Sequence, residues 1–286
     1  MTAFLRFFTM EKALDKLFSL NNKVALITGG LGQLGLEYVH ALVEREARVA
    51  IIDMSDDEVL VNDERFSPFL DKGLISSFKV DVTIREEIEV ALQKVTRDMD
   101  IPHILINNAG LDSPPDSQSS AAVGSFEDYP DSIYDQIMNV NVKGTFLCCQ
   151  SIGRAMANEG RGSIINISSI YGLVSPRQKI YEFRRKKGEE YYKPFPYSVS
   201  KSAIFNLTRY LATYWAESGV RVNTLTLAGV YNNQPDEFVH SYCEHVPLGR
   251  MANLQECIGP LIFLASDASS YVTGSNLIVD GGYTAW

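Results

Sequence analysis

The sequence predicts an α/β domain in which a doubly wound parallel sheet of about seven strands carries helices on both faces. Short runs rich in β-branched residues alternate with longer amphipathic stretches from Lys23 to the end of the chain, a pattern typical of repeated β-α-β units. Most of these runs are apolar throughout, as parallel strands buried on both faces are. The chain has 286 residues, 45% of them apolar, which is enough for one substantial core.

Six runs are predicted as strands from their composition. They are Lys23–Thr28, Arg48–Asp53, His103–Asn107, Ser163–Ser168, Val220–Thr226 and Asn276–Val279. Two stretches between them, Arg85–Met99 and Ser132–Asn158, have the length and periodicity of helices. Because no repeat, low-complexity tract or linker divides the chain, residues 23–286 are predicted to form one domain.

Residues 1–22 are predicted to be an N-terminal extension. Met10, Leu14, Leu17 and Phe18 recur at helical spacing, which favours a short amphipathic helix packed on the domain or on a partner subunit. An alternative is that Met10 is the natural start. The segment is neither long nor strongly basic, so a signal peptide or membrane anchor is not expected.

Composition excludes several classes of function. A net charge of −9 argues against a nucleic-acid binder with a broad basic face, and no apolar run is long enough to span a bilayer. The four cysteines (Cys148, Cys149, Cys243 and Cys257) lack metal-site spacing. No disulfide framework or metal site is therefore predicted, and a reducing cytoplasm is the expected location.

A glycine-rich turn follows the first predicted strand and opens a helix. Gly30, Gly32 and Gly35 satisfy G-x-G-x-x-G, a spacing that lets the backbone and a helix N-terminus approach a pyrophosphate. Asp53 ends the second strand 18 positions after Gly35, where a carboxylate can accept hydrogen bonds from the ribose hydroxyls of NAD but would repel the 2′-phosphate of NADP. The sequence therefore predicts a Rossmann fold that binds NAD rather than NADP.

Tyr197 and Lys201 lie four residues apart in a predicted helix and share one face of it. A nearby ammonium favours the phenolate, so Lys201 is expected to lower the pKa of Tyr197 toward the range of general acid–base catalysis. A tyrosine four residues before a lysine is common and does not by itself indicate a catalytic site. The other motifs of the chain make it informative.

These motifs occur in one order along the chain. They are Asp81-Val82, Asn107-Asn108-Ala109-Gly110, Asn139–Thr145 with its central Asn141, Ser168-Ser169, Pro247–Met251, Phe263–Ser269 and Val279–Gly282. In this combination the chain resembles the short-chain dehydrogenase/reductase family from about Lys23 onward, most closely its shorter single-domain branch.

The resemblance implies a role for each matched residue. Tyr197 would be the general acid–base, Lys201 would lower its pKa and hold the nicotinamide ribose, Ser169 would donate to the developing oxyanion, and Asn141 would support a relay water. The implied cofactor contacts are Gly29, Gly32, Gln33, Leu34, Gly35, Asp53, Asp81, Val82, Asn108, Ala109, Gly110, Tyr197, Lys201, Val230, Tyr231 and Asn233. No metal is implied.

Two departures affect the cofactor loops. Gln33 stands where the shorter branch usually has glycine, a spacing more typical of the extended branch with its nucleotide-sugar epimerases and dehydratases. Ala228-Gly229 replaces the usual Pro-Gly, and Asn232-Asn233 stand in place of a threonine that touches the cofactor. Length and C-terminal motifs nevertheless follow the shorter branch.

Two insertions, 112–124 and 176–196, are predicted on the substrate side. The second widens the Ser169–Tyr197 spacing to 28 positions, and residues 176–194 hold seven basic and three acidic residues among several aromatic ones. Its flanks are catalytic, so it must lie beside the active-site mouth. The composition suits an anionic, sugar-derived substrate, with Tyr171, Arg184 and Arg185 as predicted contacts. The alternative is a solvated loop or subunit contact.

The predicted function is NAD-dependent hydride transfer between nicotinamide and a secondary alcohol or ketone of a small molecule such as a sugar phosphate or nucleotide sugar. Together, the insertion and the segment Tyr231–Phe238 resemble bacterial surface-sugar dehydrogenases of the flagellin-modification and legionaminic-acid type. An epimerase or dehydratase that uses bound NAD without net redox, and a non-catalytic NAD-binding regulatory protein, are the alternatives. A homo-oligomer, a dimer or tetramer, is expected.

Overall fold

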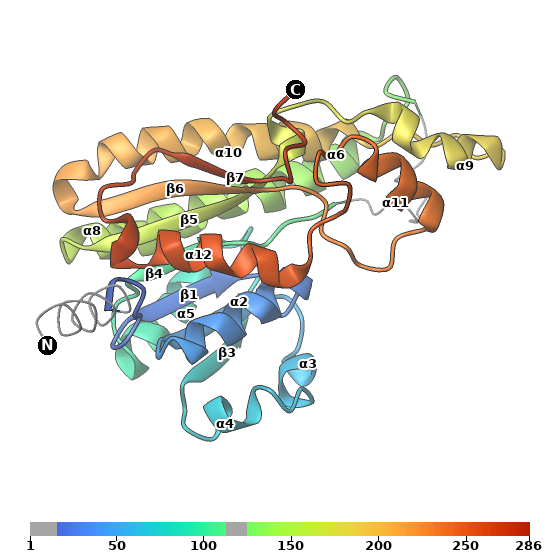
Figure 1. Cartoon of the computed structure of the whole chain (residues 1–286). Helices are drawn as coiled ribbons and strands as arrows, with labels where there is room; N and C mark the ends of the chain where they lie inside the picture. Colours follow the sequence, from blue (N-terminus) through green and yellow to red (C-terminus); the bar gives the residue numbers. More distant parts are fainter. Residues whose placement is uncertain (1–15, 113–124) are drawn as a thin grey trace, which may run out of the picture.

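The computed structural model describes residues 16–112 and 125–286, which are built around a seven-stranded parallel sheet in the order β3-β2-β1-β4-β5-β6-β7 (Figure 1). The strands are β1 (Val24–Thr28), β2 (Arg48–Asp53), β3 (Ile75–Lys79), β4 (Ile104–Asn107), β5 (Gly162–Ser169), β6 (Val220–Leu227) and β7 (Asn276–Val279). The doubly wound fold is thus confirmed. The strand order reverses between β1 and β4, which is where open α/β sheets bind their ligands.

Helices cover both faces of this sheet. They are α2 (Gln33–Glu44), α3 (Glu58–Val61), α4 (Ser67–Leu70), α5 (Arg85–Asp98), α6 (Asp131–Met138), α7 (Thr145–Cys148), α8 (Arg154–Asn158), α9 (Glu182–Lys186), α10 (Phe195–Tyr214), α11 (Asp236–Cys243) and α12 (Ile258–Ala265). One face packs against α2 and α12, and the other against α5, α7, α8 and α10.

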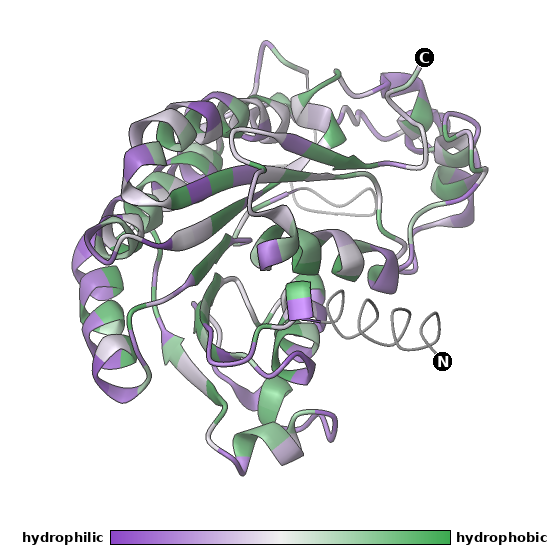
Figure 2. Ribbon diagram, turned by 60° about the vertical axis from the view of Figure 1, so that its left-hand side comes forward, coloured by the Kyte–Doolittle hydropathy of each residue, from purple (hydrophilic) through white to green (hydrophobic). Residues whose placement is uncertain are grey.

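Strand β1 shows how the sequence produces these two layers. All five of its residues are buried, and successive side chains point to opposite faces. Ala25 and Ile27 join the core beneath α2 and α12, whereas Val24 and Leu26 join the core beneath α5 and α10. Full burial of each large aliphatic side chain contributes about 1.5–3 kcal/mol. Figure 2 shows the resulting arrangement, with apolar strands between helices whose outer faces are polar.

The helix predicted over Ser132–Asn158 is one long helical region that contains two π-helical segments. It runs from α6 through η2 (Asn139–Gly144), α7 and η3 (Cys149–Gly153) to the end of α8. Such π-bulges are often found at functional sites, and η2 contains Asn141.

Strand β3 was not among the six runs assigned from composition. Its sequence is ISSFK, and it lies at the sheet edge with mostly half-buried residues. Polar residues at an edge strand weaken the apolar pattern that marks central strands, which explains why composition did not locate it.

The insertion over 176–196 folds against the C-terminal part of the chain. It contains η5 (Gln178–Tyr181) and α9, and η5 packs against α11. Helices α9 and α11 lie on the side of the molecule to which the β1 arrow points (Figure 1). A cluster of buried aromatic side chains holds it there, made up of Tyr171, Tyr181, Tyr191, Phe238, Tyr242 and Tyr283. The insertion therefore lies at the carboxyl edge of the sheet.

Two predictions fall largely outside the described residues. They are the amphipathic helix near Met10 and the insertion over 112–124, of which only Asp112 is described. In the described ranges 16–112 and 125–286, no helix is both long enough and apolar enough to cross a membrane.

Candidate active site

The glycine turn after β1 is shaped by close backbone packing. Gly29 has φ of +61°, and a Cβ there would lie 2.8 Å from the Ala109 Cα. A Cβ on Gly35 would collide with the carbonyl oxygen of Gly29. Gly29 and Gly35 are therefore required for the turn itself, before any ligand is considered.

Gly32 differs, because its Cα faces open space. A Cβ on Gly32 would meet one atom of the described chain within 4 Å, the Gly29 oxygen at 3.5 Å. Gly32 caps α2, so the backbone N–H groups of Gln33, Leu34 and Gly35 form the first turn of that helix. The first N–H groups of a helix have no partner within the helix and can donate to an anion. Because Gly32 has no side chain, a pyrophosphate can approach these groups closely.

The turn is fastened to the segment after β4. Thr28 Oγ1 accepts hydrogen bonds from the backbone N–H groups of Asn108 (3.0 Å) and Ala109 (2.9 Å). The Asn108 amide donates back to the Gly29 carbonyl oxygen at 2.8 Å. Asn108 therefore acts as a strut between the two loops, and Thr28 is a positioning residue that the sequence analysis missed.

Asp53, at the end of β2, is aimed at the glycine turn. Its Oδ2 accepts from the Leu31 N–H at 3.0 Å, and its Oδ1 accepts from the Ser55 N–H at 3.0 Å. Each carboxylate oxygen keeps a second lone pair for a ribose hydroxyl. Farther along this edge, Asp81 Oδ1 accepts from the Thr83 N–H at 2.8 Å and Val82 is buried.

Gln33 connects two cofactor loops. Its side-chain amide donates to the Tyr231 carbonyl oxygen at 3.4 Å, and Val230 pairs with Ala252 in an isolated bridge. Asn233 has φ of +54°, a left-handed conformation that asparagine tolerates better than most residues. The structure thus places Val230 and Tyr231 against the start of α2.

Ser169, Tyr197 and Lys201 converge at the carboxyl end of β5. Tyr197 and Lys201 lie on one face of α10, with the lysine Nζ 5.8 Å from the tyrosine ring centroid. Ser169 forms a side-chain hydrogen bond with Tyr197 and accepts another from the Tyr171 N–H at 3.2 Å. Lys201 Nζ donates to the Ile167 carbonyl oxygen at 3.0 Å.

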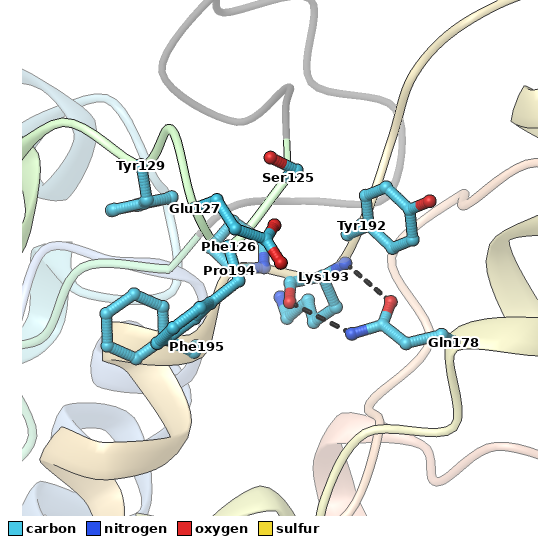
Figure 3. A pocket seen from close by; sticks show the side chains of 9 residues that line it. All are labelled: Ser125, Phe126, Glu127, Tyr129, Gln178, Tyr192, Lys193, Pro194 and Phe195. Atoms are coloured by element: carbon cyan, nitrogen blue, oxygen red, sulfur yellow. Dashed lines mark hydrogen bonds between the residues drawn. The ribbon is translucent and has the colours of Figure 1, made fainter.

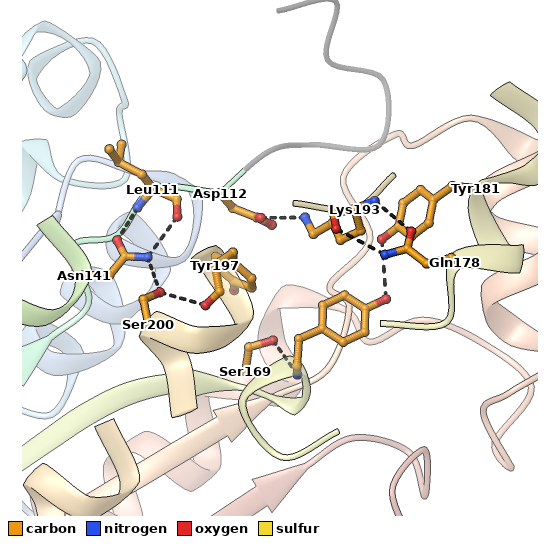
Figure 4. A network of polar contacts seen from close by, with 10 residues as sticks. Leu111, Asp112, Asn141, Ser169, Gln178, Tyr181, Lys193, Tyr197 and Ser200 are labelled. Atoms are coloured by element: carbon orange, nitrogen blue, oxygen red, sulfur yellow. Dashed lines mark hydrogen bonds and ion pairs between the residues drawn. The ribbon is translucent and has the colours of Figure 1, made fainter. Parts of the chain in front are cut away.

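Asn141 completes this group from the π-helical segment (Figure 4). Its Oδ1 accepts from the Leu111 N–H at 2.7 Å, and its Nδ2 donates to the Leu111 carbonyl oxygen at 3.0 Å and to Ser200 Oγ at 2.9 Å. Ser200 Oγ donates in turn to the Tyr197 carbonyl oxygen at 2.7 Å. Asn141 therefore ties the β4 loop to the first turn of α10, with Ser200 as a linker that the sequence analysis missed.

The expected lowering of the Tyr197 pKa by Lys201 is wrong for this structure. Burial raises the pKa of Tyr197, Asp112 raises it further, and the Ser169 hydrogen bond lowers it. Burial also lowers the pKa of Lys201 to about 8. Desolvation disfavours the charged form of both groups and outweighs their mutual attraction at this distance.

A second lysine beside Tyr197 comes from the insertion. Lys193 Nζ lies 5.1 Å from the Tyr197 ring centroid and forms an ion pair with Asp112 Oδ1 at 2.5 Å. The sequence alone did not predict this pair: Lys193 is one of several basic residues in its insertion, and Asp112 is the first residue of the other. Their positions, four residues before Tyr197 and two after Gly110, were the available signals.

Arg184 and Arg185, predicted to bind an anionic substrate, contact the insertion itself. Arg184 pairs with Glu189 at 2.5 Å and stacks on Tyr191 at 4.1 Å. Arg185 donates to the carbonyl oxygens of Tyr191 (3.0 Å) and Gln178 (2.9 Å). Both guanidinium groups thus stabilise the fold of the insertion.

Tyr171, the third predicted substrate contact, is buried beside Ser169. Its hydroxyl lies 3.5 Å from that of Tyr181, within the aromatic cluster. Its backbone N–H donates to Ser169 Oγ, while its side chain belongs to this buried cluster.

A cavity of about 380 Å³ opens next to these groups (Figure 3). It is lined by Ser125, Phe126, Glu127, Tyr129, Gln178, Tyr192, Lys193, Pro194 and Phe195. Tyr192 and Gln178 lie on one side and Phe195 and Tyr129 on the other. Lys193 connects the cavity to Tyr197, because it lines the cavity and its Nζ lies 5.1 Å from the Tyr197 ring centroid.

Comparisons with known proteins agree with this arrangement. A family model described as enoyl-(acyl carrier protein) reductase matches residues 32–284. A galactitol 2-dehydrogenase (L-tagatose-forming) from Cereibacter sphaeroides is 31% identical over 275 residues, which cover 94% of this chain and 98% of the relative.

Two solved structures are similar over nearly their whole length. A short chain dehydrogenase from Leptospira borgpetersenii with bound NAD+ is 35% identical, with a TM-score of 0.78 over 92% of this chain and 93% of that one. A gluconate 5-dehydrogenase from Burkholderia cenocepacia in complex with NADP and tartrate is 27% identical, with a TM-score of 0.81 over 96% and 99% of the two chains.

The chain therefore belongs to the short-chain dehydrogenase/reductase family. It is an oxidoreductase that transfers hydride between a nicotinamide dinucleotide, NAD or NADP, and a CH–OH group. The described residues contain no cluster of three or more His, Cys, Asp or Glu side chains that could hold a metal ion.

Proposed function

We propose that this protein is an NAD-dependent dehydrogenase of a secondary alcohol in a polyhydroxylated, sugar-derived small molecule. The observation that carries the proposal is the convergence of Ser169, Tyr197 and Lys201 at the carboxyl edge of the sheet that also presents Asp53 and the glycine turn. The similarity to a galactitol 2-dehydrogenase supports a polyol-type substrate.

The chain's residues would divide the work of oxidation. When bound, the nicotinamide would supply the hydride acceptor, so the protein has to orient the substrate and remove a proton. Tyr197 Oη would take the proton of the substrate hydroxyl, and Ser169 Oγ would hold the same oxygen. The Lys201 side chain would hold the nicotinamide ribose beside the Tyr197 ring, while Asn141 and Ser200 keep the start of α10 in place.

NAD is proposed over NADP because of Asp53. Its carboxylate points at the glycine turn, where a 2′-phosphate would meet a like charge. The test is the ratio of kcat/KM for NAD and NADP in wild type and in Asp53→Asn. We expect wild type to prefer NAD and the variant to lose at least about tenfold of that preference. A wild-type preference for NADP would contradict the assignment.

A neutral polyol is favoured over an anion by the charges around the site. Three basic side chains of the insertion form ion pairs, Arg184 with Glu189, Lys187 with Glu237 and Lys193 with Asp112. An anionic substrate, such as an aldonate or sugar phosphate, is the second candidate, since one similar structure is a gluconate 5-dehydrogenase. A screen of alditols, aldonates, sugar phosphates and nucleotide sugars, followed by NADH absorbance, decides between them.

The same screen separates the mechanistic alternatives. Stoichiometric accumulation of NADH indicates net oxidation, whereas conversion of a nucleotide sugar without free NADH would indicate an epimerase or dehydratase. Loss of turnover in Tyr197→Phe with retained NADH binding would exclude a non-catalytic NAD-binding protein. Membership in a surface-sugar subgroup stays a prediction.

Three further expectations also stay predictions. They are a homo-oligomeric state, a cytoplasmic location, and the division into an extension over 1–22 and one domain over 23–286. Light scattering of the purified chain tests the first of them directly.

A further inference from the structure

The ion pair between Lys193 and Asp112 joins the insertion over 176–196 to the segment that follows β4, beside Tyr197. Asp112 is the second residue after the Asn107–Gly110 motif, and Lys193 precedes α10 by two residues. The Lys193 side chain is only 3% exposed, whereas that of Asp112 is 41% exposed. A buried ammonium thus lies against a carboxylate that solvent or substrate can reach.

The side chain of Gln178 holds the backbone of Lys193 in one position (Figure 4). Gln178 Oε1 accepts from the Lys193 N–H at 2.9 Å, and Gln178 Nε2 donates to the Lys193 carbonyl oxygen at 3.3 Å. Pro194, which follows, is also buried. These hydrogen bonds fix the backbone, while burial and the Asp112 ion pair restrict the side chain, so that little conformational entropy remains for it to lose on binding a ligand.

Stability alone does not explain a buried lysine at this place. Removing the Lys193 ammonium from water costs free energy that its attraction to a carboxylate 41% exposed to solvent does not fully return. The pair is also close enough to Tyr197 for Asp112 to raise the pKa of the phenol, which on its own works against a catalytic base. A role in binding would account for both features.

The cavity indicates what the pair binds. Lys193 lines the cavity, and its Nζ lies 5.1 Å from the Tyr197 ring centroid. A substrate whose reacting oxygen bonds to Tyr197 and Ser169 would extend its remaining carbons toward the cavity. Lys193 lines this cavity and Asp112 is its ion-pair partner, so the pair offers an ammonium donor and a carboxylate acceptor beside Tyr197, and a hydroxyl group can bond to both.

We propose that Lys193 and Asp112 bind the substrate hydroxyl next to the reacting carbon and so make the enzyme selective for vicinal diols over isolated secondary alcohols. The Lys193 ammonium donates to the oxygen of this hydroxyl, and the Asp112 carboxylate accepts its hydrogen. The pair has no net charge, so it needs no phosphate or carboxylate on the substrate. This inference rests on the proposed function and narrows it to polyhydroxylated carbon chains.

The experiment compares butane-2,3-diol with butan-2-ol as substrates in the presence of NAD. The measured quantity is the ratio of their kcat/KM values in wild type, in Lys193→Met and in the control Lys179→Met, an exposed lysine of the same insertion. We expect the wild-type ratio to fall about 10- to 100-fold in K193M, the usual effect of losing a hydrogen bond to a charged group. The ratio should stay unchanged in K179M.

Several outcomes would overturn the inference. An unchanged ratio in K193M would do so while leaving the proposed function intact. If the ratio is unchanged because kcat/KM falls equally on both alcohols, the pair positions Tyr197 instead. If wild type oxidises neither alcohol nor any polyol of the screen, the proposed function fails and the inference fails with it. Asp112→Asn serves as a second variant where K193M does not fold, and it should lower the ratio in the same direction by a smaller factor.

Discussion

The cofactor side and the substrate side of this molecule are fixed by different kinds of contact. On the cofactor side, glycines pack against backbone atoms, and Thr28, Asp53 and Asn108 hydrogen-bond to backbone N–H and carbonyl groups. On the substrate side, ion pairs such as Lys193–Asp112 and a cluster of aromatic side chains hold the insertion. The first arrangement is built on contacts to backbone atoms, and the second is built on contacts between side chains.

This difference predicts separate responses to mutation. Changes at Gly29 or Gly35, where a Cβ would meet backbone atoms, should affect folding and dinucleotide binding together. Changes on the substrate side should affect turnover or selectivity while dinucleotide binding persists. Four experiments test this separation.

The largest effect is expected from Tyr197→Phe. Loss of the general acid–base should lower kcat by about 10²- to 10⁴-fold. NADH binding, followed by fluorescence, and the thermal midpoint should remain close to wild type, since the ring and its contacts are kept. Tyr210→Phe, at an exposed position of the same helix, is the matched control. Unchanged turnover in Y197F would contradict the assigned role.

The glycine turn provides the next test. Gly35→Ala places a Cβ against the backbone of Gly29 and Gly30, which should destabilise the chain by about 1–3 kcal/mol and weaken NADH binding. Gly32→Ala meets only ordinary contact, so it should keep the wild-type unfolding midpoint while hindering the approach of the pyrophosphate. Denaturant unfolding and NADH titration measure both. Equal destabilisation by the two variants would show that Gly32 serves only the turn.

Lys201 should make stability depend on pH without added cofactor. Burial lowers its pKa from 10.5 to about 8, so the folded state binds fewer protons than the unfolded state between these values, and stability rises with pH in that window. Relative to Lys201→Met, the free energy of unfolding should rise by about 2 kcal/mol from pH 7 to 9.5. The comparison with K201M is needed because buried Cys148, Cys149 and Cys257, whose pKa values are raised, act in the opposite direction. If the difference in unfolding free energy between wild type and K201M does not change with pH, the Lys201 pKa lies near its ordinary value.

The smallest effect is expected at the exposed ion pair between Lys187 and Glu237, where both side chains are more than half exposed. Lys187→Met should change the free energy of unfolding by less than about 0.5 kcal/mol. Arg184→Met, at a pair whose arginine is buried, should cost clearly more. If K187M were the more destabilising of the two, packing of the aromatic cluster would not be what holds the insertion.

The sequence predicted the sheet and the glycine turn, because each depends on local spacing or on an apolar run, and motif spacing alone singled out Asn141, Ser169, Tyr197 and Lys201 as the candidate site. It did not predict the positioning roles of Thr28 and Ser200, whose hydrogen bonds join segments that are far apart in the sequence and adjacent in the fold. It assigned Arg184 and Arg185 to an anionic ligand because composition cannot show that Glu189 and backbone carbonyls lie within reach. It also expected Lys201 to lower the Tyr197 pKa, because spacing along a helix says nothing of the desolvation that reverses the shift.

The construction of the insertion has a consequence for how such enzymes diversify. Arg184 with Glu189, and Gln178 with Lys193, form contacts that begin and end within the same short segment, while the strands below it continue in register from β5 to β6. The segment also packs against Phe238 and Tyr242 and pairs with Glu237 and Asp112. Its exchange for one of different length between Ser169 and Tyr197 would therefore need matching changes in α11 and after β4, while the strands and the glycine turn could stay as they are.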